Sequence, residues 1–211
     1  MADLGERRLY LCTPDRPDLA EFVEACISGG VDIVQLRDKV LDARPLLARA
    51  AVAAEVCRRL GVPFVINDRP DLALEVGADG VHVGQDDAPP ALARRILGDE
   101  AIVGYSTHAP AEFDAALAEP ADYFSVGPVV PTPTKPGRAG TGLGYLGHAM
   151  ANADRPWFVT GGVTPETIPG LVAAGASRFV VVRYLTEAPD PETAARSLRT
   201  AIEEALGSQA P

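Results

Sequence analysis

The sequence predicts an α/β fold of the (β/α)8 TIM-barrel class, with residues 1–211 forming a single domain. Three observations predict it. Short apolar runs rich in β-branched residues alternate with segments of helical periodicity along almost the whole chain. About eight such units fit into a chain of this length, which is typical of a closed parallel barrel. The runs are apolar on both faces, as expected of a sheet that is covered on both sides.

The elements follow one another in a regular order. The expected strands comprise residues 9–12, 32–36, 63–66, 80–83, 101–105, 123–126, 157–160 and 178–182, each a short apolar run. The expected helices carry apolar residues at helical spacing and comprise residues 18–27, 44–60, 71–76, 91–97, 111–118, 143–153, 165–174 and 191–206. An open doubly wound sheet is the alternative. It needs a glycine-rich turn after the first strand, where this chain has Thr13-Pro14-Asp15-Arg16-Pro17.

The composition limits the class of protein. Of the 211 residues, 47% are hydrophobic and 23% are charged, and the net charge is −10. This acidic balance argues against a nucleic-acid partner, although cations gathered at one place can still bind phosphates. No apolar stretch has the length that crosses a bilayer, residues 1–8 are polar, and the cysteines are odd in number (Cys12, Cys26 and Cys57). We therefore expect a cytoplasmic protein without a membrane partner; a homo-oligomer is compatible with this composition.

In barrels of this class the chemistry lies at the carboxyl ends of the strands. At the end of the second strand, Gln35, Arg37 and Lys39 alternate with other residues. Because a strand has a side-chain period of two, these three should point the same way. Arginine offers a fork of donors and lysine a compact charge, which together suit an anion. The alternative is an exposed edge strand with a solvated cationic face.

Acidic and amide side chains follow the next two strands. Asn67 and Asp68 come after the third strand, and Gly84-Gln85-Asp86-Asp87 comes after the fourth. Two carboxylates from neighbouring strand ends, Asp68 with Asp86 or Asp87, are the kind of site that holds Mg²⁺ together with substrate phosphates. The alternative for each aspartate is that it caps the helix that follows.

The later strand ends add anion donors. Ser106 can hydrogen-bond a phosphate or cap the next helix, and a lone His108 is more often structural or solvated. The loop of residues 127–137 carries two hydroxyls and one ammonium among four prolines, which suits donors held in a fixed geometry. Gly162 and Arg183 stand where this fold commonly builds a phosphate site. The sequence thus predicts two anion sites, a metal near one of them, and two small phosphorylated substrates.

These residues resemble those of the thiamine phosphate synthase family, barrel enzymes that join the pyrimidine and thiazole halves of thiamine. The resemblance spans residues 9–185 or so, and it rests on Gln35-x-Arg37-x-Lys39, Val65-Ile66-Asn67-Asp68, His82-Val83-Gly84-Gln85-Asp86-Asp87 and Pro131-Thr132-Pro133-Thr134-Lys135. By that likeness, Mg²⁺ is held by Asp68 and Asp87, and the thiazole phosphate by Thr132, Pro133, Thr134, Gly162, Val182 and Arg183. The hydroxymethylpyrimidine diphosphate is held by Gln35, Leu36, Arg37, Asp38, Lys39, Asn67, Ser106 and Lys135, among which Lys135, Arg37 and Ser106 are catalytic.

The resemblance also implies a dissociative displacement, in which Mg²⁺ and cations neutralise the departing pyrophosphate and the thiazole nitrogen captures a pyrimidine methylene cation. One departure concerns Arg183, because the family often has serine there. Arginine can still bind phosphate through its fork. We expect that contact if Val180 and Val182 face the helices; otherwise Arg183 pairs with Glu187 at the surface.

Two alternatives to this function remain open. A thiazole tautomerase is a related barrel that binds the thiazole phosphate but transfers no pyrimidine, and it should not need the carboxylates Asp68 and Asp87. A non-catalytic barrel that only binds phosphorylated ligands belongs to a different class of protein. The intact set of cations and carboxylates argues against both.

Overall fold

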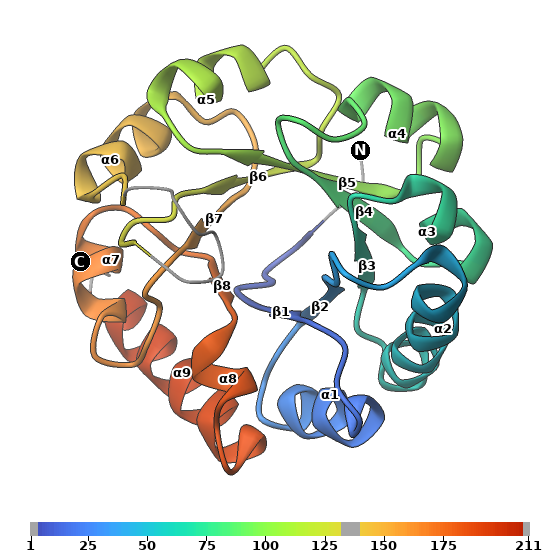
Figure 1. The fold of residues 1–211 in the computed structure, drawn as a ribbon. Helices are drawn as coiled ribbons and strands as arrows, with labels where there is room; N and C mark the ends of the chain where they lie inside the picture. Colours follow the sequence, from blue (N-terminus) through green and yellow to red (C-terminus); the bar gives the residue numbers. More distant parts are fainter. Residues whose placement is uncertain (1–3, 132–139, 209–211) are drawn as a thin grey trace.

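Eight parallel strands close into a barrel in chain order in the computed structural model, which describes residues 4–131 and 140–208 (Figure 1). The strands are β1 (Leu9–Thr13), β2 (Ile33–Leu36), β3 (Phe64–Asn67), β4 (Gly80–Val83), β5 (Ile102–Thr107), β6 (Tyr123–Val126), β7 (Trp157–Thr160) and β8 (Phe179–Val181). The helices outside the strands are α1 (Leu19–Ser28), α2 (Ala43–Leu60), α3 (Pro70–Val76), α4 (Pro90–Leu97), α5 (Pro110–Ala116), α6 (Leu143–Asn152), α7 (Ile168–Ala173), α8 (Arg183–Thr186) and α9 (Pro191–Gly207).

The strand pairing confirms the predicted TIM barrel. Each strand pairs in parallel with its neighbours in the sequence, and β1 closes the ring by pairing with β8, with Leu9 opposite Phe179. An open doubly wound sheet would leave two free edges, so that alternative is wrong. Within the described residues, no helix combines the length and the apolar character that crossing a bilayer requires.

The alternation of side chains along the strands produces two hydrophobic cores. The larger core lies between the strands and the helices and contains residues such as Leu36, Phe124 and Val181. The smaller core fills the inside of the barrel and comprises Leu4, Tyr10, Ile33, Val65, Ile102, Tyr123 and Phe158, with Val180 packed against it. Since this inner core occupies the amino-terminal part of the strands, polar side chains can occupy the carboxyl-terminal part.

The predicted bounds differ from the observed ones mainly at the carboxyl ends of strands. Asn67 is the last residue of β3, and Ser106 lies inside β5, which continues to Thr107. Both residues were expected in the loops that follow. The short helix α8 was not predicted at all. These polar residues are part of the barrel wall, so the backbone hydrogen bonds of the sheet fix their positions.

Candidate active site

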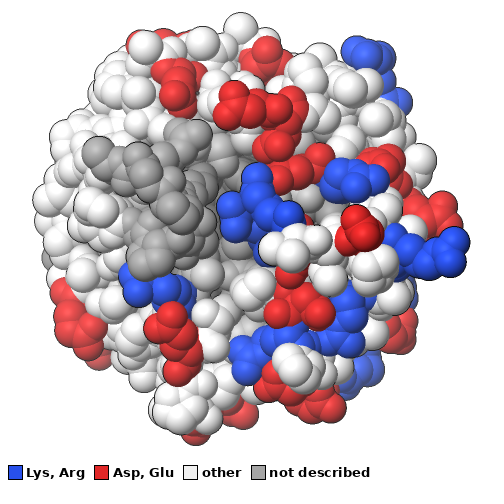
Figure 2. Space-filling view, in the orientation of Figure 1, with Lys and Arg blue, Asp and Glu red and all other residues white. Residues whose placement is uncertain are grey.

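A cavity of about 650 Å³ opens at the carboxyl ends of the strands. Strand-end residues from all around the barrel line it: Tyr10, Cys12, Gln35, Arg37, Asn67, His82, Ser106, Ser125, Thr160, Gly162, Val182 and Arg183. The space-filling view of this face shows lysine and arginine side chains near its centre, with acidic side chains next to them (Figure 2). A chain with a net charge of −10 therefore brings cations to the mouth of its cavity.

The three polar residues Gln35, Arg37 and Lys39 at the end of β2 do not all face the cavity. Gln35 is buried inside the barrel, and Arg37 lines the cavity. The Arg37 guanidinium forms no ion pair with any described carboxylate, so its donors are available to an anion. Lys39 instead pairs with Asp68, its Nζ lying 2.8 Å from Oδ2. Because β2 pairs with both β1 and β3, the exposed edge strand considered above is wrong.

Two neighbours in this run do not present their side chains to the cavity. Leu36 packs into the outer core, as the alternation along β2 requires. The Asp38 carboxylate accepts hydrogen bonds from the backbone amides of Val40 (2.9 Å) and Leu41 (2.8 Å), which closes the loop before α2. A contact of either residue with substrate would therefore come from the backbone.

Asp68 and Asp87 meet at the ends of β3 and β4. Burial and the facing Asp87 carboxyl raise the pKa of Asp68, and they outweigh the Lys39 ammonium that acts in the opposite direction. Asp87 also accepts a hydrogen bond from the Gly84 amide, with 2.9 Å between N and Oδ2. Neither aspartate caps a helix, because the N-cap residues of α3 and α4 are Arg69 and Pro89, and neither helix has a side-chain cap. Asp86 is exposed, so the structure favours Asp87 as the partner of Asp68.

The backbone of Asp68 has a φ of 64°, and it is the one residue other than glycine with positive φ among those the structure describes. Aspartate tolerates this left-handed conformation better than most residues, but the conformation still costs free energy. The carboxyl of this residue faces that of Asp87. Within the described ranges, no three His, Cys, Asp or Glu side chains gather as a metal site. A pair of carboxylates is nevertheless what Mg²⁺ commonly uses when substrate oxygens and water complete its shell.

Asn67 supplies a donor without an acceptor. Its side chain is buried and lines the cavity, and its Nδ2 has no hydrogen-bond partner among the described residues. A buried amide donor left unpaired costs about 1–3 kcal/mol, so a ligand oxygen at this position would remove a penalty. Ser106 lies in the same cavity and contacts His82 and Ser125 (2.8 and 3.2 Å) rather than capping α5.

On the opposite wall, Gly162, Val182 and Arg183 lie together at the ends of β7 and β8. Gly162 has a φ of 73°, and a Cβ there would meet the Val130 side chain, so both conformation and space call for glycine. Val180 packs against the inner core, so the condition under which Arg183 was expected to point toward the cavity is not met. Arg183 lines the cavity all the same, because β8 ends at Val181 and α8 begins at Arg183.

Two further predictions can be placed. Arg183 and Glu187 are both exposed and described, and they form no ion pair, so the predicted pairing with Glu187 is wrong, whereas the exposed position of Arg183 agrees with that alternative. The His108 ring contacts the Gly127 carbonyl, with 2.8 Å from Nδ1 to oxygen, which is a structural role. Thr132, Pro133, Thr134 and Lys135 lie outside the described residues.

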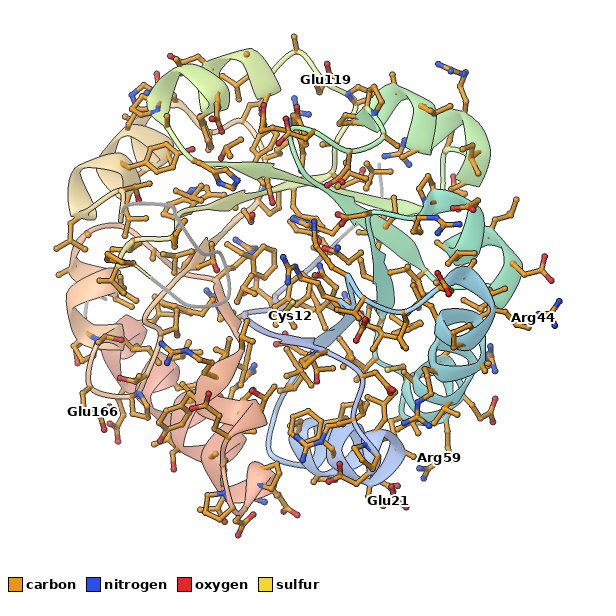
Figure 3. The ribbon with its side chains drawn as sticks, viewed as in Figure 1. Cys12, Glu21, Arg44, Arg59, Glu119 and Glu166 are labelled. Carbon is orange, nitrogen blue, oxygen red and sulfur yellow. The ribbon has the colours of Figure 1, made fainter. Side chains whose placement is uncertain are left out.

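Sequence reasoning missed several residues that line the cavity: Tyr10, Cys12, His82, Ser125 and Thr160. Figure 3 shows Cys12 near the middle of the barrel, whereas Arg44 and Glu21 lie at the outer helices. The alternation of inward-facing and outward-facing side chains within the strands is the signal that could have identified them. His82 stands between Val81 and Val83, which both pack into the outer core, so His82 has to face the inside.

Comparisons with known proteins identify the family of the chain. Residues 9–185 match the family model described as thiamine monophosphate synthase. The chain is 52% identical over 202 residues to the thiamine-phosphate synthase of Thermobifida fusca, covering 93% of this chain and 92% of that protein. It is 48% identical over 212 residues to the thiamine-phosphate synthase of Mycobacterium sp. (strain JLS), covering 94% of each.

A solved structure gives the same answer. The thiamine phosphate pyrophosphorylase from Pyrococcus furiosus superposes with a TM-score of 0.86 at 29% identity, covering 96% of this chain and 98% of that one. The family match, the high identity to curated relatives and the shared barrel all cover nearly the full length. The chain therefore belongs to the thiamine monophosphate synthase family, and it is a transferase of thiamine biosynthesis.

Proposed function

We propose that this protein couples hydroxymethylpyrimidine diphosphate with a thiazole phosphate, or its carboxylated form, to give thiamine phosphate and pyrophosphate. One observation carries the proposal. A single cavity joins Arg37 and Asn67, which have donors to spare, to Gly162 and Arg183 on the opposite wall. Two anion sites in one cavity fit a reaction between two phosphorylated substrates better than the binding of one ligand.

The diphosphate side comprises the ends of β2, β3 and β5. Arg37 and Asn67 would donate to phosphate oxygens, and Ser106 would donate from β5. The family resemblance adds Gln35, Lys39 and Lys135 to this side. Leu36 and Asp38 would contribute backbone groups only, because their side chains point elsewhere.

Asp68 and Asp87 fit a divalent cation. Two carboxyls that face each other repel when both are ionised, and Mg²⁺ between them would remove that repulsion. The metal, when bound, would neutralise charge on the leaving pyrophosphate. In the structure described here Lys39 partly offsets the negative charge of the carboxyl pair through its ion pair with Asp68.

The thiazole phosphate side comprises the ends of β7 and β8. Gly162 has no side chain of its own that would separate a phosphate from its backbone amide, and the Val130 side chain lies beside it. Arg183 and the backbone at Val182 would complete the site. Thr132, Pro133 and Thr134 join it by family resemblance.

The chemistry needs no protein nucleophile. The bond between the pyrimidine methylene and the diphosphate oxygen breaks, and its electron pair leaves with pyrophosphate. The thiazole nitrogen lone pair then forms the new carbon–nitrogen bond. If the thiazole is carboxylated, CO2 is lost after coupling. The chain's own residues hold both reactants in line, and Arg37 with Lys135 stabilises the charge that develops on the leaving group.

Incubation with both phosphates and Mg²⁺, followed by oxidation and fluorescence detection of thiamine phosphate, tests the proposal. Formation of the product supports it. A thiazole tautomerase would convert the thiazole phosphate without the pyrimidine substrate, and a non-catalytic barrel would bind both without product; either result would contradict the proposal. All three cysteines are buried thiols that form no disulfide, which supports a reducing, cytoplasmic compartment.

A further inference from the structure

A continuous chain of hydrogen bonds crosses the inside of the barrel. It begins at Cys12, whose Sγ lies 3.1 Å from Oε1 of Gln35, and Gln35 Nε2 donates to the Tyr10 hydroxyl at 2.7 Å. The Tyr10 and Tyr123 hydroxyls lie 2.9 Å apart, and Tyr123 lies 2.9 Å from Nδ1 of His82. His82 Nε2 lies 2.8 Å from the Ser106 hydroxyl. The chain thus links Gln35 on β2 to Ser106 on β5 through buried side chains.

Tyr123 differs from the other members of this chain. Tyr10, Gln35, His82 and Ser106 line the cavity, but Tyr123 is fully buried beneath it and is not a lining residue. Gly104 makes room for it, because a Cβ there would collide with the Tyr123 ring and with His82 Nδ1. The sequence therefore provides space for one internal contact, that between a tyrosine hydroxyl and a histidine ring nitrogen.

The hydrogen bonds have a direction, which begins at the amide of Gln35. An amide nitrogen can only donate, so the Tyr10 oxygen accepts, and the single Tyr10 proton goes to Tyr123. The single Tyr123 proton then goes to Nδ1 of His82. Burial raises the pKa of both phenols, so each keeps its proton. An imidazole that accepts at Nδ1 carries its proton on Nε2, and it donates to the Ser106 oxygen.

Ser106 consequently has its own proton left to give. Its second contact, with Ser125, is 3.2 Å long, beyond the usual range of a hydrogen bond between two hydroxyls. A ligand oxygen in the cavity would be a better acceptor.

We propose that Tyr123 is a positioning residue: it holds His82 as the Nε2–H tautomer, so that Ser106 presents its hydroxyl proton to the substrate. The part of this inference that concerns substrate rests on the proposed function, because Ser106 and Gln35 belong to the proposed pyrimidine diphosphate side.

The hydrogen bonds of this chain could also run in the opposite direction, from Ser106 to Gln35, without violating any donor or acceptor rule. The two directions differ in a measurable property, so the inference can be tested. If Gln35 presented its oxygen to Tyr10, every proton in the chain would reverse. His82 would then carry its proton on Nδ1, and the Ser106 hydroxyl would donate its proton to Nε2 of His82. The tautomer of one histidine therefore reports the direction of the whole chain.

Nitrogen NMR of the full-length protein labelled with ¹⁵N-histidine measures that tautomer directly. The chain has three histidines, and the variants His108→Gln and His148→Gln assign the signals of the other two. We expect His82 in wild-type protein to be the Nε2–H form. The Nδ1–H form would overturn the proposal. This measurement needs no substrate, so it stands whether or not the proposed function holds.

The variant Tyr123→Phe removes only the central hydroxyl and keeps the ring against Tyr10 and Phe158. We expect mixed His82 tautomers and a KM for the pyrimidine diphosphate raised about fivefold to tenfold, as the loss of one hydrogen bond predicts. The KM for the thiazole phosphate should not change, because its proposed site lies at β7 and β8.

Tyr145→Phe is the matched control. It also removes a buried tyrosine hydroxyl, which donates to Thr107 Oγ1 at 2.6 Å on the outer side of β5. We expect it to leave the tautomer and both KM values unchanged. Unchanged tautomer and KM in Tyr123→Phe would overturn the proposal, as would equal KM changes in both variants. If Tyr123→Phe does not fold, the wild-type tautomer alone decides.

Discussion

Three features of Asp68 raise the free energy of the protein when no ligand is bound. Its backbone has a positive φ, its carboxyl is withdrawn from water, and a second carboxyl faces it. Each raises the free energy of the protein without a ligand, and Lys39 offsets only part of this. Strain of this kind persists when the surrounding structure enforces it, and it is commonly found at binding sites. A divalent cation between Asp68 and Asp87 would make both carboxylates favourable.

The first prediction concerns this pair. Asp68→Asn and Asp87→Asn should each lower turnover by about 100-fold or more, because each would remove one of the two anionic ligands proposed for the metal. Asp86→Asn is the control, since Asp86 is exposed one residue away. Steady-state rates across a Mg²⁺ titration measure the effect. If Asp87→Asn keeps normal turnover at low Mg²⁺ while Asp86→Asn loses it, Asp86 is the ligand instead.

The second prediction concerns Arg183. Arg183→Ser should raise the KM for the thiazole phosphate about tenfold, since one charge-assisted hydrogen bond is lost, and should leave the KM for the pyrimidine diphosphate unchanged. Arg44→Ser is the control, because Arg44 lies at the outer surface of α2 (Figure 3). Initial rates with each substrate varied in turn give both constants. Unchanged constants would place Arg183 outside the site.

At the scale of elements, the sequence predicts the order of strands and helices well, because each is long enough to show its period. The errors occur where the period is interrupted. Ser106 and Thr107 are polar, so they suggest a loop, yet both belong to β5. Ser106 faces the polar end of the barrel interior, and the Thr107 hydroxyl is hydrogen-bonded to the Ser125 carbonyl and to Tyr145 on the outer side. The four-residue helix α8 is too short to show helical periodicity.

Only part of the site can be predicted from the sequence, because only some of its residues interrupt the apolar pattern of the strands. Charged residues such as Arg37 and Asp68 stand out in the sequence because they are costly inside a strand. Tyr10 and His82 do not, because aromatic residues are ordinary members of a core. Their role depends on contacts across the barrel between β1, β4 and β6, which no local pattern contains.

The third prediction concerns α9 and its cap. Asp190 accepts hydrogen bonds from the Thr193 amide (3.0 Å) and hydroxyl (2.7 Å), the one side-chain N-cap among the described helices. Asp190→Ala should lower the melting temperature by about 2–4 °C at neutral pH. Asp42→Ala is the control, because Asp42 occupies the same position at α2 without a capping bond.

The pH dependence of this effect has a definite sign. The bonds from Thr193 hold the pKa of Asp190 below its usual range. The stabilisation is therefore complete above the pKa of the unfolded chain and is lost as the pH falls through the lowered folded value. Melting curves of wild type and Asp190→Ala should converge in acid. A difference that is constant with pH would contradict the role of the ionised carboxylate.

At the scale of the whole molecule, strands all around the closed barrel contribute residues to one site. Residues from β1 to β8 line one cavity, and each strand is held by two neighbours in the ring. The barrel cannot open locally without breaking the pairing that positions Arg37, Asn67 and Arg183. A ligand in the cavity should therefore stabilise the fold as a whole rather than one element.

The fourth prediction follows from that coupling. A ligand at about 100 times its dissociation constant adds about 2.7 kcal/mol of stability, which for a chain of this size corresponds to about 5–10 °C in melting temperature. Pyrophosphate with Mg²⁺ should give a shift of this order, whereas either alone should give less, because Asp68 and Asp87 would hold the metal proposed here and the metal would offset the negative charge of the anion. Thermal melting with each addition measures it. In Asp87→Asn the extra shift from the combination should disappear, while in Asp86→Asn it should persist. Equal shifts with and without Mg²⁺ in wild type would show that the anion binds through Arg37 and its neighbours alone, and that the carboxylate pair holds no metal.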